Sequence, residues 1–212
     1  MFAIGDNGTS PRGGGRLAMQ ESVESRTSEC NEMADPCINP NHALLISCTE
    51  IDAKVTELAG QIDRDHSGKS PVVVGILKGA FMFLADLIRQ METPIKSVEF
   101  IRVSSYGAST ATSGQPKMVV DLAPEAVEGE DVIVVEDIVD TGLSTQLAME
   151  HLRTLKPASL VLCSLLDKPS RRRVPVTANY IGFTLPDKFV VGYGLDAGEL
   201  DRQLPDIYTI ED

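Results

Sequence analysis

Short runs of apolar residues alternate along the chain with stretches in which apolar residues recur every three or four positions. The first such stretch predicts an amphipathic helix over residues 48–64. Ser47 and Glu50 at its start have the spacing of a capping box, in which two side chains satisfy free backbone N–H groups. The apolar positions of this helix are Ile51, Val55, Leu58 and Ile62.

The continuous apolar runs are typical of strands that are buried on both faces. Two further helices are expected between them, from Gly79 to about residue 88 and from about residue 142 to 155. Strands that alternate with helices form a parallel sheet with helices on both faces, so the sequence predicts an α/β domain. The expected strands are 72–77, 97–104, 117–122, 131–136, 158–166, 178–184 and 189–193.

Residues 1–42 have a different composition from the rest of the chain. They contain three consecutive glycines at 13–15, scattered serines and few large apolar residues. Such a segment cannot bury enough apolar surface to offset the entropy of ordering it. We therefore expect a mostly disordered tail at 1–42, followed by one domain at 43–212. The first residues also lack the basic and then apolar order of a secretory signal.

Composition narrows the possible partners and the compartment. The 212 residues include 31 acidic and 19 basic side chains, a formal net charge of −12. This acidity argues against broad electrostatic binding to nucleic acid or to anionic membranes. No run of about 18 apolar residues occurs, so no membrane-spanning helix is expected. Four cysteines are too few for a disulfide scaffold and favour a reducing, cytoplasmic location.

Residues 132–145 carry most of the candidate chemistry. A β-branched strand ends in Glu136 and Asp137, and a third carboxylate, Asp140, follows after two apolar residues. The next residues, rich in hydroxyl groups, open a helix, and the free N–H groups of a helix start bind phosphate. They are Thr141, Gly142, Leu143, Ser144 and Thr145.

Carboxylates beside a phosphate site repel the ligand unless they bind hydroxyl groups or a metal. A ribose 5-phosphate meets both demands, because its phosphate would lie on the helix start while Glu136 and Asp137 accept hydrogen bonds from its 2′ and 3′ hydroxyls. The simpler alternative is an acidic strand end beside a threonine helix cap.

This segment resembles the phosphoribosyl pyrophosphate (PRPP) motif of type I phosphoribosyltransferases, and most of all that of hypoxanthine-guanine phosphoribosyltransferases. The resemblance extends over roughly residues 45–210. It implies a central, mostly parallel sheet with helices on both faces, a small hood and a mobile lid loop. The PRPP and phosphate residues it implies are Glu136, Asp137, Asp140, Thr141, Gly142, Leu143 and Ser144.

The same resemblance assigns residues to pyrophosphate. A loop after the first buried strand would hold the leaving group through backbone N–H groups and a lysine, and its Leu77–Lys78 peptide can be cis in the family. The polar loop at 105–116 would close over the site and exclude water. The pyrophosphate residues it implies are Leu77, Lys78, Gly79, Ser105, Tyr106 and Arg202.

It also assigns the purine and metal contacts. Lys168 would donate to the 6-oxo group and Phe189 would stack on the base; a solvated lysine and a core phenylalanine are the alternatives. The purine set is Lys168, Phe189, Val190 and Asp196, and the residues near Mg²⁺ are Glu136, Asp137 and Asp196. Ala197 and Asp201 stand where relatives commonly have aromatic residues.

The activity implied is transfer of the 5-phosphoribosyl group of PRPP to N9 of a 6-oxopurine, with Mg²⁺ as cofactor. The base would be hypoxanthine or guanine, with xanthine left open, and the products IMP or GMP and pyrophosphate, as in purine salvage. Asp140 would be the general base. Relatives usually form homodimers or homotetramers.

Three alternatives remain open at this point. One is a phosphoribosyltransferase for another base. A second is a PRPP-sensing regulator that binds nucleic acid on the same fold, which would need a basic face; Arg171-Arg172-Arg173 is the only basic cluster. The third is a small-molecule-binding α/β domain without catalysis.

Overall fold

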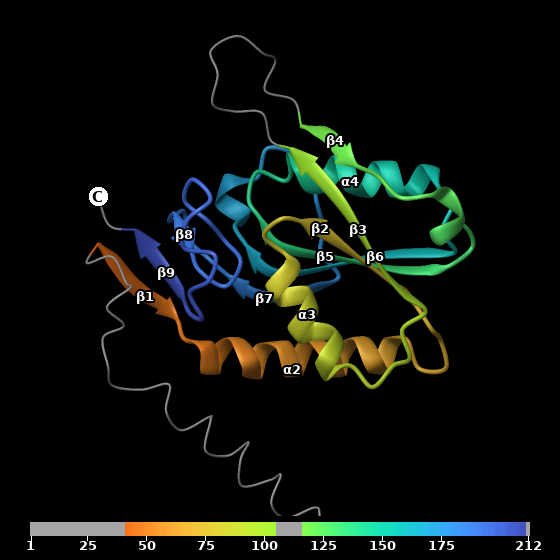
Figure 1. The fold of residues 1–212 in the computed structure, drawn as a ribbon, viewed down its shortest axis with the longest axis horizontal. Helices are drawn as coiled ribbons and strands as arrows, with labels where there is room; N and C mark the ends of the chain where they lie inside the picture. The colour runs from red at the N-terminus through yellow and green to blue at the C-terminus, as the bar shows by residue number, and fades with distance from the viewer. Residues whose placement is uncertain (1–40, 105–115, 211–212) are drawn as a thin grey trace, which may run out of the picture. The chain divides into compact units, whose positions relative to one another are not determined.

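The computed structural model describes residues 41–104 and 116–210 (Figure 1). The described residues belong to one compact unit that begins at Asn39. Most of the predicted tail, together with Ser105 and Tyr106 of the predicted lid loop, lies outside the described residues. Within the described ranges, no helix combines the length and the apolar character needed to cross a membrane.

A six-stranded sheet forms the centre of the domain, in the order β4-β3-β2-β5-β6-β7. All neighbouring strands are parallel except β4, which runs antiparallel to β3 at one edge. The mostly parallel sheet expected from the sequence is confirmed. The strands are β2 (Val72–Leu77), β3 (Ser97–Ser104), β4 (Lys117–Val120), β5 (Asp131–Val139), β6 (Ser159–Asp167) and β7 (Tyr180–Thr184).

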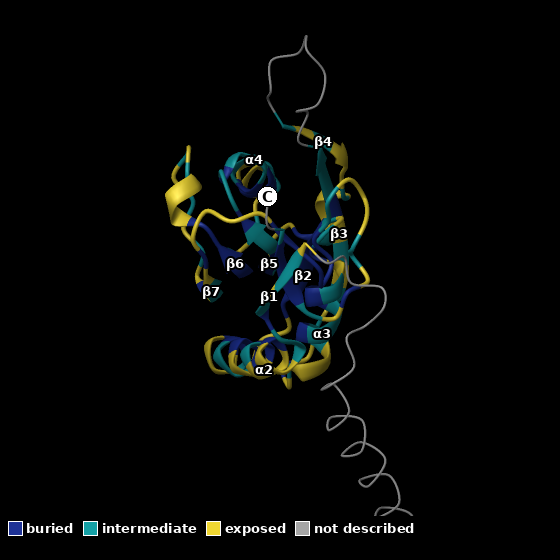
Figure 2. Cartoon of the chain, turned by 90° about the vertical axis from the view of Figure 1, so that its left-hand side faces the viewer, coloured by how far each residue is buried: buried dark blue, intermediate teal, exposed yellow. Residues whose placement is uncertain are grey.

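Helices cover both faces of this sheet (Figures 1 and 2). On one face lie α2 (Cys48–Asp65) and α3 (Phe81–Gln90), and on the other lies α4 (Leu143–Thr154). The predicted capping box is present, because the Ser47 side chain accepts from Glu50 N–H and the Glu50 carboxylate accepts from Ser47 N–H. Two short 3₁₀ turns, η1 (Pro124–Ala126) and η2 (Pro169–Arg171), complete the connections.

The central strands bury both of their faces, which explains their continuous apolar runs. Val73 lies in the core shared with α2 and α3, whereas Val72 and Val74 lie in the core shared with α4. All three side chains are fully buried. Figure 2 shows these strands in the dark blue interior between helices whose outer surfaces are exposed.

The strand β5 runs three residues further than the sequence predicted. Ile138 pairs with Leu166 and Val139 with Asp167 of β6, so the ladder continues past the two carboxylates. Glu136 and Asp137 therefore belong to the strand itself rather than to its end, and their backbone is fixed by the sheet. Asp140 is the first residue after the strand.

A second, antiparallel sheet has the order β1-β9-β8 and corresponds to the expected hood. The strand expected at 189–193 is only Val190–Val191 and belongs to this sheet instead of the central one, which corrects the prediction. The chain turns away at once because Gly192, Tyr193 and Gly194 all have left-handed backbones, with φ of 95°, 49° and 97°. The strands are β1 (His42–Ile46), β8 (Val190–Val191) and β9 (Ile207–Ile210).

Candidate active site

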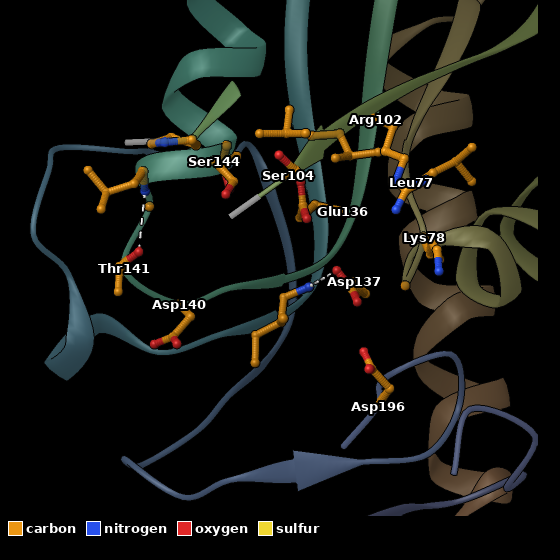
Figure 3. Close-up of a pocket in the computed structure, with 18 of the residues that line it drawn as sticks. Leu77, Lys78, Arg102, Ser104, Glu136, Asp137, Asp140, Thr141, Ser144 and Asp196 are labelled. Atoms are coloured by element: carbon orange, nitrogen blue, oxygen red, sulfur yellow. Dashed lines mark hydrogen bonds between the residues drawn. The ribbon is translucent and has the colours of Figure 1, made fainter. Parts of the chain in front are cut away.

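A cavity of about 650 Å³ opens at the carboxyl ends of β2, β3 and β5, beside the start of α4 (Figure 3). This is where open α/β sheets bind their ligands. The cavity brings together most of the residues that the sequence singled out. They are Leu77, Lys78, Gly79, Glu136, Asp137, Asp140, Thr141, Gly142, Leu143, Ser144, Asp196 and Arg202.

The start of α4, where the sequence predicts a phosphate site, forms one end of the cavity. Gly142 precedes the helix with a left-handed φ of 84°, and a β-carbon there would meet Arg172 Cδ and Val176 Cγ2 at 3.1 Å. A glycine is therefore required by conformation and by space. Thr141 Oγ1 accepts weakly from Leu143 N–H at 3.5 Å. No acidic residue stands in the first turn of α4, so its N–H groups face the cavity with their positive dipole end uncompensated.

Glu136 and Asp137 form an acidic pair on β5, in which Glu136 is buried and Asp137 half-buried. Glu136 is 7% exposed, and its Oε2 has no hydrogen-bond partner among the described residues. Burial, and then the neighbouring charge and hydrogen bond of Asp137, raise the pKa of Glu136 well above its usual range. Burial also raises the pKa of Asp137, although the Ile138 N–H that it accepts at 2.9 Å acts in the opposite direction.

A buried carboxylate without a donor is costly, so this pair is suited to a ligand that brings hydroxyl donors or a cation. Among the described residues, no three acidic, histidine or cysteine side chains gather as a metal cluster. Mg²⁺ commonly uses one or two carboxylates plus substrate oxygens, and the unpartnered Glu136 oxygen fits such a role. Asp196 lies across the cavity from Asp137 (Figure 3), already bonded to Arg202 and to Glu199 N–H.

The pyrophosphate loop predicted at 77–79 lines the same cavity, and its Leu77–Lys78 peptide is cis. The hood packs closely against this loop at Gly194. A β-carbon added there would lie 2.2 Å from the Gly79 carbonyl oxygen. The loop and the hood are therefore in direct backbone contact.

Three cationic side chains of the described residues line the cavity, Lys78, Arg102 and Arg202, and two of them form ion pairs. Lys78 Nζ pairs with Glu199, and Arg202 pairs with Asp196 and Glu199. Arg102 has no carboxylate within ion-pair distance in the described part of the chain. It is thus the cation most available to an incoming anion.

The sequence analysis assigned no contact to Arg102, Ser104 or Glu199, which all line this cavity. Arg102 and Ser104 stand two apart on β3, so both face the same side of the strand just before the predicted lid. Ser104 Oγ is buried without a partner in the described residues. The alternation of side chains along β3 could have indicated Arg102 and Ser104 as cavity residues. No local sequence pattern indicated Glu199.

Of the predicted purine residues, Asp196 lines this cavity, whereas Lys168, Phe189 and Val190 lie outside its walls. Arg171 links Asp140 to the segment that carries Phe189. Its Nε donates to Asp140 Oδ1 at 3.2 Å, and its Nη1 lies 3.5 Å from Oδ1 of Asp187, two residues before Phe189. Phe189 is 57% exposed, so core packing does not explain it. Lys168 is buried, so it is not a solvated lysine.

Lys168 Nζ donates to the backbone carbonyl of Lys188, which aims the amine along the loop before β8. Burial lowers the pKa of Lys168, while the charge of Asp140 opposes that shift. Val190 pairs with Thr209 in the hood. The Lys168 amine therefore contacts the segment that carries Phe189 and Val190.

Arg172 positions the turn between β5 and α4. Its Nη1 donates to the carbonyl oxygens of Val139 and Asp140 at 2.8 and 2.7 Å, and its Nη2 bonds Asp167. Arg171 and Arg172, two of the three residues in the basic cluster, are thus engaged in contacts with residues around the cavity. They do not form the free basic face that a nucleic-acid-binding regulator would need.

These features define a phosphoribosyl-transferring α/β enzyme, and comparison with known proteins agrees. Residues 47–197 match the family described as the phosphoribosyl transferase domain, so the chain belongs to the phosphoribosyltransferase family. The match spans the carboxylate pair and the start of α4, where the phosphate site is predicted.

Within that family, the chain is similar to hypoxanthine-guanine phosphoribosyltransferases. It is 48% identical over 170 residues to the hypoxanthine-guanine phosphoribosyltransferase of Aquifex aeolicus, covering 80% of this chain and 94% of that protein. It is 44% identical over 168 residues to the Bacillus subtilis protein of the same name, covering 79% and 92%.

Solved structures give the same result. A hypoxanthine phosphoribosyltransferase from Staphylococcus aureus matches with a TM-score of 0.77 and 41% identity, covering 85% of this chain and 97% of that one. The type I phosphoribosyltransferase fold and the family resemblance inferred from the sequence are both confirmed.

Proposed function

We propose that the protein transfers the 5-phosphoribosyl group of PRPP to N9 of hypoxanthine or guanine, giving IMP or GMP and pyrophosphate. One observation carries the proposal most directly. The acidic pair Glu136 and Asp137 shares one cavity with the open N-terminus of α4, and the buried Glu136 has an oxygen without a partner among the described residues. Polar hydroxyl groups and a phosphate on the same ligand satisfy both features.

In this arrangement the 5-phosphate of PRPP lies on the N–H groups and hydroxyls at 141–144. The ribose hydroxyls donate to Glu136 and Asp137, which removes the cost of the unpartnered carboxylate. The pyrophosphate group faces the 77–79 loop, where Lys78 and Arg202 supply positive charge.

The reaction separates charge at the C1′ atom of the ribose. As the bond to pyrophosphate breaks, C1′ becomes cation-like and the leaving group gains negative charge. The carboxylates near the ribose stabilise the first change, and Lys78 and Arg202 stabilise the second. Bound Mg²⁺, held by substrate oxygens with Glu136, Asp137 or Asp196 nearby, would supply further charge stabilisation to the leaving group.

The nucleobase would enter beside Asp140, the first residue after β5. Asp140 would accept a hydrogen bond from the N7–H group of the purine and take this proton as N9 attacks C1′. Lys168 would donate to the 6-oxo oxygen, which disfavours adenine because adenine carries an amino donor there. Phe189 would stack on the ring and the Val190 backbone would hydrogen-bond its edge.

We also propose a homodimer or homotetramer, supported by apolar side chains that stay exposed on neighbouring elements. Phe81 on α3 and Val98 and Phe100 on β3 are 36–39% exposed. Sedimentation that gives only a monomer at micromolar concentration would contradict this. The cytoplasmic location remains a prediction; Cys163 is a buried free thiol in the described part of the chain.

The deciding experiment is an assay with PRPP, Mg²⁺ and, separately, hypoxanthine, guanine, xanthine and adenine. We expect turnover with hypoxanthine or guanine and much less with adenine. Absence of activity with every purine would contradict the proposed function. Nucleic-acid binding that responds to PRPP in a gel shift would instead support the regulator.

A further inference from the structure

The Glu199 carboxylate pairs with Lys78 and Arg202, the two cations that the proposed function assigns to pyrophosphate. Its carboxylate oxygens lie 2.8 and 2.9 Å from Lys78 Nζ, and one of them lies 3.3 Å from Arg202 Nη2. Glu199 itself lines the cavity. An anionic side chain of the protein thus stands where an anionic ligand is expected.

The backbone aims this side chain into the cavity. Glu199 has a left-handed φ of 75°, which is uncommon for a residue other than glycine. Its N–H donates to Asp196 Oδ2 at 2.7 Å, and Asp196 Oδ1 is 2.7 Å from Arg202. The turn that carries Glu199 is therefore tied to the same arginine that its carboxylate contacts.

The interaction is ionic but easily exchanged. A hydrogen bond from Lys78, together with the positive charges of Lys78 and Arg202, lowers the pKa of Glu199, so it is ionised at neutral pH. The Glu199 and Lys78 side chains are 62% and 43% exposed, and exposed ion pairs are weak. A ligand with several negative charges can displace such a carboxylate.

We propose that Glu199 holds the pyrophosphate position in the ligand-free enzyme and is displaced when PRPP or pyrophosphate binds. Resting on the proposed function, this makes Glu199 a residue that sets the affinity for the pyrophosphate end of the substrate. Because the exchange costs one ion pair, it favours pyrophosphate over weaker anions such as inorganic phosphate. It also assists release of the pyrophosphate product.

The test compares Glu199→Gln with wild type and with Glu57→Gln. Glutamine keeps the size of the side chain and removes its charge. Glu57 is a matched control, because it is also an exposed glutamate in an ion pair, with Lys54 at 2.5 Å, but lies on α2 and does not line the cavity. Calorimetry measures binding of pyrophosphate with Mg²⁺, and steady-state kinetics measures KM for PRPP and for hypoxanthine.

For Glu199→Gln we expect pyrophosphate to bind about two- to five-fold more tightly and KM for PRPP to fall by a similar factor, the range expected for one exposed ion pair. Inhibition by inorganic phosphate should strengthen as well. KM for hypoxanthine should stay unchanged, and Glu57→Gln should behave as wild type throughout.

Unchanged pyrophosphate affinity in Glu199→Gln would overturn the proposal by making the ion pair incidental. Weaker affinity would overturn it by making Glu199 a helper of the ligand or its metal. Pyrophosphate binding is measured without turnover, so this result stands apart from the proposed function. That function fails separately, if the wild-type enzyme shows no PRPP-dependent reaction with any purine.

Discussion

Gly79 lies directly against the carboxylate of Asp137, so that a β-carbon at position 79 would come within 1.6 Å of Asp137 Oδ2. On the other side of the loop, a β-carbon added at Gly194 of the hood would lie 2.2 Å from the Gly79 carbonyl oxygen. The 77–79 loop, the Asp137 carboxylate and the hood are therefore packed in contact with no side chain between them. Any added volume in the loop must move at least one of them.

Replacing Gly79 by alanine should consequently damage catalysis through space alone. We expect kcat/KM for PRPP to fall about 100-fold, because displacement of reacting groups by ~1 Å can cost that much. Gly60→Ala is the control: Gly60 lies inside α2, and a β-carbon there meets only Arg64 Nη1, at an ordinary 3.6 Å. It should stabilise the protein by about 0.5–1 kcal/mol and leave the kinetics unchanged. Normal kinetics in Gly79→Ala would refute the tight packing.

Asp140→Asn tests the general base. Asparagine keeps the shape of the side chain but cannot accept the proton, so kcat should fall by about 10²–10⁴. Asp187→Asn removes the other carboxylate near Arg171 and should leave kcat close to that of wild type. An Asp140→Asn enzyme with unaltered turnover would remove Asp140 from this role.

Lys168→Gln tests recognition of the 6-oxo group. Loss of a charged donor should raise KM for hypoxanthine about 10- to 100-fold, the value of a hydrogen bond to a charged group, and should spare KM for PRPP. Lys188→Gln is a suitable control, because only the backbone carbonyl of Lys188 contacts Lys168. Equal losses for both substrates would count against the assignment.

Glu136→Gln should separate stability from substrate binding. The pKa of Glu136 is raised in the folded protein above its usual value of 4.5. The folded state therefore binds a proton at Glu136 more tightly than the unfolded state does, which stabilises the fold fully below about pH 4.5. That stabilisation is lost as the pH rises through the folded-state pKa. Glutamine does not titrate. Thermal unfolding of the variant without ligand should match wild type near pH 4 and exceed it at pH 8.

The expected gain at pH 8 is on the order of 1–3 kcal/mol, or about 2–4 °C in Tm for each kcal/mol. Affinity for PRPP should fall in the same variant, because a carboxylate acceptor for the ribose is lost. Glu128→Gln, at an exposed position, should show neither effect. A variant that is less stable than wild type at pH 8 would contradict the raised pKa.

The sequence predicted the elements whose patterns are local and strong. Buried strands such as β2 are continuous apolar runs, and α2 carries both its spacing and its capping box. The strands β1 and β9 were missed, because a segment of four or five residues shows its partner only in the folded chain. Gly192 to Gly194 likewise shortened β8 through left-handed backbones that composition alone did not reveal.

The candidate site divides in the same way. The carboxylates and the turn at 141–144 lie within one continuous segment, so the sequence alone could single them out as a candidate site. The pairs Lys78–Glu199 and Asp140–Arg171 join residues 121 and 31 positions apart, and no local pattern encodes them. The exposure of Phe189 and the burial of Lys168 also depend on such distant packing.

The pairing of β1 with β9 has a consequence for biosynthesis. His42 pairs with Ile210, so the first strand of the domain to leave the ribosome has to wait for the last one. Until residues 207–210 emerge, β8 lacks its neighbour and the segment that carries Val190 is not anchored. A nascent chain can thus assemble its central sheet early, yet we expect it to acquire a purine site only once synthesis has passed β9.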